Sequence, residues 1–157
     1  MMTLVQIIEY EDQYHDVFRE LNMEWLVKYN LLEPRDLDTL NNPREILHHG
    51  GAIYLAQFNG IIVGSAALIK EHDNVYELAK MSVAANYRNK GISRLLIERC
   101  LDKAKELHAS KITLFSNHQL KAALGLYEKY GFQYVPVEDS PFLTADIKMQ
   151  LCLTENR

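Results

Sequence analysis

An Asn-Gly pair between two apolar runs places the strongest constraint on the fold of this sequence. The stretch GAIYLAQFNGIIVGSAALI covers residues 51–69, with Asn59 and Gly60 at its centre. Asn-Gly readily adopts the two positive φ angles that a two-residue hairpin turn requires. The stretch therefore predicts two antiparallel strands joined at residues 59–60.

Hydrophobic spacing along the rest of the chain predicts further strands and helices around this hairpin. Residues 33–49 predict short helices, with Pro34 and Pro43 in their first turns and Asn42 as a cap. The expected order of elements is βααβββαβαββ. Strand-like runs occupy residues 4–10, 75–83, 111–116, 132–138 and 146–153, and apolar residues recur at helical spacing over 12–29, 91–108 and 118–130.

The expected helix at 91–108 fixes how its two flanking strands run. A strand that is reached through a helix returns parallel to the strand before it, so 75–83 and 111–116 should be parallel neighbours. The hairpin strands before them are antiparallel. We therefore expect an α/β or α+β fold built on a mixed, mostly antiparallel central sheet of six to seven strands, with helices on both faces.

Composition and charge narrow the range of partners. The chain has 157 residues, 48% of them hydrophobic, and a formal net charge of −4. We expect one domain over residues 1–157. A net negative surface repels nucleic acid and anionic membranes. With neither a long apolar run nor a leader-like start in the sequence, we expect a cytoplasmic protein.

The cysteines and histidines argue against a disulfide framework or a metal site. Cys100 and Cys152 are the only two cysteines, and we expect both in the core of a protein from a reducing compartment. His48 and His49 are adjacent and cannot face one ligand sphere from a helix. No metal is implied.

A basic loop precedes the helix at 91–108. The stretch NYRNKGISRLLIERCLDKAKE, residues 86–106, sets Arg88, Lys90 and Arg94 around Gly91. The first N–H groups of a helix have no partner within it and attract anions, and the glycine lets a ligand approach the backbone. The pattern indicates a phosphate site, although a solvated loop remains the alternative. It matches neither the P-loop nor the dinucleotide glycine fingerprint.

The segment RNKGIS resembles the phosphate-binding loop of the GNAT superfamily of N-acetyltransferases, and YELAKMSV before it and LYEKYGF after it extend the resemblance over about residues 75–135. The resemblance implies an acetyltransferase that uses acetyl-CoA. It also implies that the loop binds the pyrophosphate of that cofactor. Ser93 departs from the family pattern, which usually has Gly or Ala there. The implied loop residues are Arg88, Asn89, Lys90, Gly91, Ile92, Ser93 and Arg94.

The same resemblance implies how the rest of the cofactor would be held. The backbone of Met81, Ser82 and Val83 would pair with the pantetheine arm in the manner of an added strand. The side-chain amide of Asn117 matches a family contact to the cofactor arm. A helix cap for residues 119–130 is the alternative role for Asn117.

Glu77 is the candidate general base. Alternation along the strand places it on one face with Val75, Ala79, Met81 and Val83, where it is the only charged residue. A carboxylate among apolar neighbours has a raised pKa, which suits the removal of a proton from an ammonium group, directly or through water. The glutamate of many family members stands at the corresponding place. A structurally idle glutamate is the alternative.

Tyr127 is the candidate general acid. Its helical spacing from Leu120, Ala123 and Leu124 places its ring inward, and an ordinary tyrosine is protonated at neutral pH. The resemblance implies that its hydroxyl faces the thioester sulfur. Tyr130 is the rival residue in the same helix.

The acceptor side of the site is less constrained by the sequence. Trp25, Tyr29 and Glu33, together with Glu138 and Asp139, form an aromatic and acidic set that would suit a cationic amine, either a small molecule or a peptide amino group. Two other functions remain open, a non-catalytic acyl-CoA sensor and a site for another phosphorylated nucleotide. The apolar last strand is compatible with a homodimer.

Overall fold

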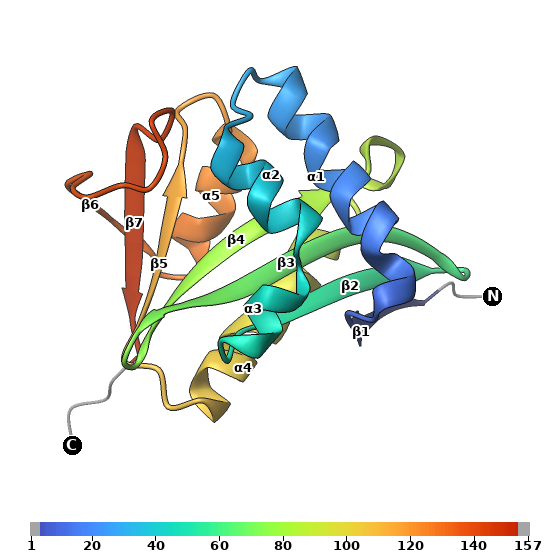
Figure 1. The fold of residues 1–157 in the computed structure, drawn as a ribbon, viewed down its shortest axis with the longest axis horizontal. Coiled ribbons are helices and arrows are strands. Elements are labelled where there is room, and N and C mark those ends of the chain that lie inside the picture. Colours follow the sequence, from blue (N-terminus) through green and yellow to red (C-terminus); the bar gives the residue numbers. More distant parts are fainter. Residues whose placement is uncertain (1–3, 154–157) are drawn as a thin grey trace.

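The computed structural model describes residues 4–153, which form one seven-stranded sheet with helices on both faces (Figure 1). The strand order is β1-β2-β3-β4-β5-β7-β6. In chain order the elements are β1 (Val5–Glu9), a 3₁₀ turn (Asp12–Tyr14), α1 (His15–Lys28), α2 (Pro34–Asn41), α3 (Arg44–His48), β2 (Ala52–Phe58), β3 (Ile61–His72), β4 (Val75–Val83), a second 3₁₀ turn (Ala85–Tyr87), α4 (Ile92–Glu106), β5 (Lys111–Ser116), α5 (Lys121–Lys129), β6 (Gln133–Val135) and β7 (Ile147–Cys152).

The expected sheet topology is confirmed. The β2–β3 hairpin turns at Asn59 and Gly60, whose φ angles are 51° and 79°. Strands β4 and β5 pair in parallel, and each of the other neighbouring pairs is antiparallel. The mixed sheet therefore follows from one turn and one helical crossover, both visible in the sequence.

Two local expectations differ from the structure. Asn42 caps the end of α2 by donating from Nδ2 to the carbonyl of Asp38 at 3.0 Å, and Pro43 occupies the cap position of α3. Cys100 is buried, as expected, but Cys152 is exposed; the pairing of β6 with β7 ends at Gln150, two residues before it.

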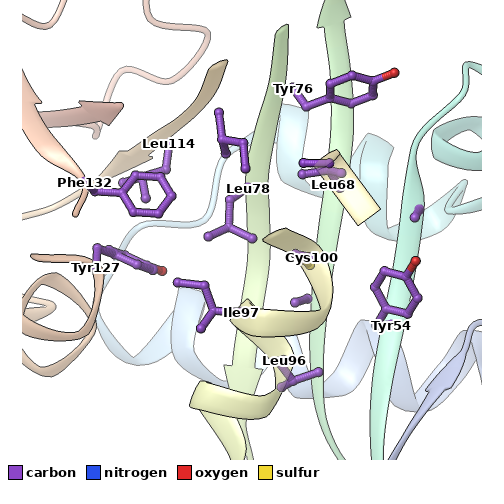
Figure 2. Close-up of a cluster of buried hydrophobic side chains, with 14 of the residues drawn as sticks. Tyr54, Leu68, Tyr76, Leu78, Leu96, Ile97, Cys100, Leu114, Tyr127 and Phe132 are labelled. Carbon is purple, nitrogen blue, oxygen red and sulfur yellow. The ribbon is translucent and has the colours of Figure 1, made fainter. Parts of the chain in front are cut away.

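Two buried clusters hold the helices against the sheet. On one face, Phe18, Leu21 and Leu26 of α1 pack with Leu40 of α2 and Ile46 of α3 against β2 and β3. On the other face, α4 and α5 pack against the strands through the cluster drawn in Figure 2, whose labelled members are Tyr54, Leu68, Tyr76, Leu78, Leu96, Ile97, Cys100, Leu114, Tyr127 and Phe132. Burial on both faces makes the sheet a rigid support for the groups at its centre.

A β-bulge in β4 changes which side chains share a face. Lys80 has a φ of 52°, and the register of β3 against β4 shifts between Ser65 and Ala67. Glu77 and Ala79 therefore face the α1–α3 side, but Met81 and Val83 pack into the cluster under α4. The expectation of one unbroken face is wrong, because a bulge inserts one residue and reverses the alternation after it.

The bulge is held by polar contacts from α1. The hydroxyl of Ser65 donates to the carbonyl of Lys80 at 2.7 Å and accepts from Nδ2 of Asn22 at 3.0 Å. The hydroxyl of Ser82 donates to the carbonyl of Leu21 at 2.8 Å. In a regular sheet the carbonyl of Lys80 would pair with a neighbouring strand. Here the Ser65 hydroxyl satisfies it instead.

Lys80 itself forms a buried ion pair. Its side chain lies on the same face as Glu77, where Nζ contacts Oδ1 of Asp36 in the first turn of α2, and the two residues are 7% and 2% exposed. Asp36 also accepts a hydrogen bond from the backbone N–H of Glu33 at 2.9 Å. The pair therefore joins the start of α2 to the centre of the sheet.

We expect Asp36→Asn to destabilise the fold by on the order of 3 kcal/mol, because it leaves the Lys80 ammonium buried without a countercharge. Urea denaturation at pH 7 measures the change. Asp38→Asn, an exposed position on the same helix, is the matched control and should stay within about 0.5 kcal/mol of the parent. Lys80→Met in the Asp36→Asn background should restore stability, and an unchanged Asp36→Asn variant would contradict the role of the pair.

Candidate active site

Strands β4 and β5 part just beyond Glu77. Their parallel pairing consists of Val75, Tyr76 and Glu77 against residues 111–113, although β4 continues to Val83 and β5 to Ser116. Figure 1 shows the two strands side by side at their start and diverging toward their ends. The facing edges beyond Glu77 thus have backbone groups that no neighbouring strand uses, which is the geometry that an extended ligand can join.

The basic loop lies between the end of β4 and the start of α4. Asn89 and Gly91 have φ angles of 62° and 80°, and Gly91 is the N-cap of α4 without any side-chain cap. A Cβ built on Gly91 meets nothing within 4 Å, so the space in front of this backbone is open. Unsatisfied first-turn N–H groups beside open space fit a phosphate-bearing ligand.

The three cations of the loop have different surroundings. Nε of Arg88 donates to the carbonyl of Val83 at 3.0 Å, and its Nη2 lies 3.9 Å from Oε1 of Glu24. Lys90 and Arg94 are exposed, and within residues 4–153 neither makes an ion pair. Arg88 therefore fixes the loop to β4, while Lys90 and Arg94 remain available for an anion. Asn89 is exposed, Ile92 is buried, and Ser93 is half-buried.

Glu77 is the buried carboxylate at the point where the strands part. It is 6% exposed, and in the described part of the chain no hydrogen bond is donated to it. Burial, followed by the negative charge of Glu71, raises the pKa of Glu77 to about 7, although the positive charges of Lys80 and Arg35 act against this rise. A carboxyl group with a pKa near neutrality can take and release a proton at physiological pH.

Two cavities open onto Glu77. The smaller, about 70 Å³, lies between β4, β5 and α1 and includes Trp25 and Asn117 in its wall. The larger, about 330 Å³, lies between β3, β4 and the helices α2 and α3. Glu77, Ala79, Lys80 and Phe142 line both. Phe142 lies beneath two cations, with Nζ of Lys80 5.4 Å and Cζ of Arg35 5.8 Å from its ring centroid.

Glu33 fastens the loop before β7 over this region. Its carboxylate accepts hydrogen bonds from the backbone N–H of Leu143 at 3.0 Å, the backbone N–H of Thr144 at 2.8 Å, and the Thr144 hydroxyl at 2.6 Å. Burial alone would raise the pKa of Glu33, but these hydrogen bonds and the charge of Lys80 outweigh it and lower that pKa. Glu33 is thus occupied in positioning Phe142. Neither cavity that contains Glu77 is lined by Glu138 or Asp139, which are exposed.

The remaining expected residues lie around the smaller cavity or next to it. Trp25 lines it and donates from Nε1 to Oδ1 of Asn22 at 3.1 Å. Tyr29 is half-buried, and its carbonyl accepts a hydrogen bond from Gln119 at 3.3 Å. Asn117 donates from Nδ2 to the carbonyl of Thr144 at 2.9 Å and accepts from the N–H of Gln119 at 3.0 Å. It therefore stabilises both the turn before α5 and the loop that Glu33 holds.

Tyr127 and Tyr130 have different environments. The Tyr130 hydroxyl donates to Glu98. Tyr127 is 8% exposed and points from α5 into the cluster under the sheet, with its ring centroid 5.9 Å from that of Phe132 (Figure 2). Its hydroxyl has no hydrogen-bond partner within residues 4–153. Every side-chain oxygen or nitrogen that is fully buried in this part of the chain does have a partner. The hydroxyl oxygen therefore keeps some access to the outside of the cluster.

Burial determines the proton affinities in this cluster. It raises the pKa of Tyr127 to about 12, with a further contribution from Cys100. Burial also raises the pKa of the Cys100 thiol to about 12. Both groups are therefore protonated at neutral pH.

Sequence reasoning did not single out three side chains of the site: Lys80, Asp36 and Phe142. No group of three or more potential metal ligands occurs in residues 4–153, and no helix in that part has the length and apolar character of a membrane span.

Comparison with known proteins identifies the family. The family model described as Acetyltransferase (GNAT) family matches residues 14–132. Among relatives, N-acetylaspartate synthetase of Xenopus tropicalis is 43% identical over 89 residues, which are 56% of this chain and 33% of that protein. The chain thus spans about a third of the length of the N-acetylaspartate synthetases that it matches.

Solved structures agree in fold. A GNAT-family acetyltransferase from Staphylococcus aureus Mu50 has a TM-score of 0.89 at 26% identity, covering 96% of this chain and all of that one. The PaiA N-acetyltransferase from Thermoplasma acidophilum in complex with coenzyme A has a TM-score of 0.77 at 16% identity, covering 96% of this chain and 99% of that one. The family match covers most of the chain and includes the parted strands, the bulge and the basic loop. The chain belongs to the GNAT acetyltransferase family.

Proposed function

We propose that the chain is an N-acetyltransferase that moves the acetyl group of acetyl-CoA directly to a primary amine in a ternary complex. The observation that carries the proposal is the parting of β4 and β5 beside Glu77, whose buried carboxylate opens onto two cavities. Two similarities support this reaction type. An N-acetyltransferase in complex with coenzyme A shares the fold, and N-acetylaspartate synthetases are sequence relatives.

The chain's own groups divide the binding of acetyl-CoA between them. The diphosphate would be held by the backbone N–H groups of residues 90–94 and by the charges of Lys90 and Arg94, with Arg88 fixing the loop. The backbone of Met81–Val83 would pair with the extended arm, and Asn117 would stand at the end of β5. Bound acetyl-CoA supplies an activated thioester, whose C–S bond breaks as the new C–N bond forms.

Glu77 acts as the general base. An ammonium group has no lone pair, so the acceptor must lose a proton before or during attack, and the Glu77 carboxylate takes it directly or through a water molecule. Its pKa of about 7 leaves a substantial deprotonated fraction at neutral pH. Within residues 4–153, Glu77 is the only carboxylate that lines both cavities; Asp36 lines the smaller one and is paired with Lys80.

Tyr127 acts as the general acid. In water a thiolate is a weaker base than a phenolate, so a tyrosine would give up its proton to it only at a cost. Burial raises the pKa of Tyr127 to about 12, and desolvation of a thiolate that leaves beside it would raise the basicity of that sulfur in the same way. The Tyr127 hydroxyl can then stabilise a departing sulfur and pass its proton to it.

Charge reversal should separate binding of the cofactor from catalysis. We expect Lys90→Glu with Arg94→Glu to raise the KM for acetyl-CoA more than about tenfold, because two charge-assisted contacts become repulsive. Isothermal titration with coenzyme A should give a matching loss of affinity. Lys103→Glu with Lys105→Glu, at the other end of α4, makes the same net charge change and should leave the KM unaltered. Equal effects of the two pairs of substitutions on the KM would show that the loop at residues 88–94 does not bind the cofactor.

The pH dependence tests the base. Only the deprotonated carboxylate accepts a proton, so kcat/KM should rise with pH through about 7 and then level off. Glu77→Gln should abolish this rise with pH and lower kcat by roughly 10²- to 10⁴-fold. Glu71→Gln is the control, since the negative charge of Glu71 raises the pKa of Glu77. This variant should stay active, with the rise in kcat/KM shifted to lower pH. An unshifted pH profile in both variants would exclude Glu77 as the base.

A matched pair of tyrosine variants tests the acid. Tyr127→Phe removes only the hydroxyl and should lower kcat by about 10²-fold while leaving the affinity for coenzyme A nearly unchanged. Tyr130→Phe should retain most of the activity, because that hydroxyl is engaged with Glu98 at the surface. A fully active Tyr127→Phe enzyme would assign the acid role to water or to another group.

A further inference from the structure

The larger cavity beside Glu77 has the size of a small-molecule site. Its volume is about 330 Å³, and its wall is built by α2, α3, β3 and β4, with Phe142 closing one side. Small-molecule pockets combine an apolar surface with a few charged or polar groups that orient the ligand. The polar groups of this cavity therefore indicate what the acceptor carries besides its amine.

Arg35 is the cation of this wall that is pre-oriented and has no anion. Its guanidinium lies over the Phe142 ring at 5.8 Å, and within residues 4–153 it makes no hydrogen bond or ion pair. The next arginine along the chain, Arg44, donates from Nε and Nη2 to Asp12 at 3.1 and 3.0 Å. A guanidinium held by an aromatic face keeps its N–H edge free for a carboxylate, which it binds through two hydrogen bonds.

The other charged groups of the wall are less suited to this task. Lys80 is neutralised by Asp36. Lys70 is exposed, as Arg35 is, but no aromatic ring in residues 4–153 orients it. The acids Asp38 and Glu45 line the same cavity, and Glu45 is 3.8 Å from His49. Arg35 is close enough to Glu77 for its charge to lower the pKa of that carboxyl. A base and a free guanidinium thus face one small cavity.

We propose that the acceptor is a small amine that also carries a carboxylate, in chemical terms an amino acid, and that Arg35 binds this carboxylate while the amine faces Glu77. The inference rests on the proposed acetyl transfer and makes Arg35 a specificity-determining residue. It differs from the expectation of an aromatic and acidic rim for a cationic amine or a peptide amino group, because Glu33 is occupied by Leu143 and Thr144. A zwitterion matches both charges of the cavity.

The test compares acceptors that differ only in the carboxylate. Release of free thiol from acetyl-CoA is measured with L-alanine, L-aspartate and L-alaninamide. The amine of the amide is less basic and more readily neutral, so a preference for the acids cannot arise from the amine. We expect kcat/KM for L-alanine to exceed that for L-alaninamide at least about tenfold, and Arg35→Gln to remove this preference through KM.

Controls separate this inference from the proposed function. Arg44→Gln should leave every acceptor unchanged. Arg35→Gln also removes a charge that lowers the pKa of Glu77, so the enzymes are compared on the high-pH plateau, where kcat/KM for L-alaninamide should fall far less than that for L-alanine. In the presence of coenzyme A, L-aspartate should raise the melting temperature of the parent but not of Arg35→Gln. Equal transfer to L-alanine and L-alaninamide, or equal loss for both in Arg35→Gln, overturns this inference alone. Absence of thiol release with the three amines and with ethylamine, propylamine and a lysyl peptide overturns the proposed acetyl transfer and this inference with it.

Discussion

The left-handed backbone of Lys80 in the middle of β4 is the constraint on which the placement of the site depends. A bulge bends a strand and increases its twist, and the pairing of β4 with β5 ends at Glu77, three residues before it. The same bulge moves the Lys80 side chain onto the face of Glu77 and moves Met81 and Val83 to the opposite face. One backbone conformation thus lies where the sheet parts, places a cation beside Glu77, the proposed base, and fixes the residues at the gap.

The surrounding elements compensate for this conformation. The Ser65 hydroxyl, which accepts a hydrogen bond from Asn22, donates to the carbonyl of Lys80, and Asp36 neutralises the Lys80 ammonium. Asp36 lies in the first turn of α2. Glu33, the N-cap residue of this helix, holds the loop that carries Phe142. The proposed acceptor side of the site is therefore connected to the bulge through one chain of buried and half-buried contacts, so a change at α2 should affect both cavities.

The sequence was informative where a local signal exists and silent where the signal is long-range. Asn59-Gly60 predicted the hairpin, and the helix after Gly91 predicted the parallel pair, because turn chemistry and crossover geometry are local. The bulge was missed because Lys80 has no sequence feature that favours a positive φ angle. The Asp36–Lys80 pair and the Glu33–Thr144 contact join residues far apart in the chain, and no periodicity reveals them. Glu77 was identified correctly as a buried carboxylate, but its cationic neighbours were not.

Hydrogen exchange on addition of coenzyme A tests most directly whether the gap beside the bulge and the tip of α4 act together as one ligand site. Amide exchange would be followed by mass spectrometry or NMR with and without coenzyme A. We expect slower exchange in two separate segments, residues 81–83 on β4 and residues 90–94 at the start of α4, with little change in the β1–β2 hydrogen bonds. Unchanged exchange in both segments at saturating coenzyme A, or slower exchange confined to other parts of the sheet, would contradict it.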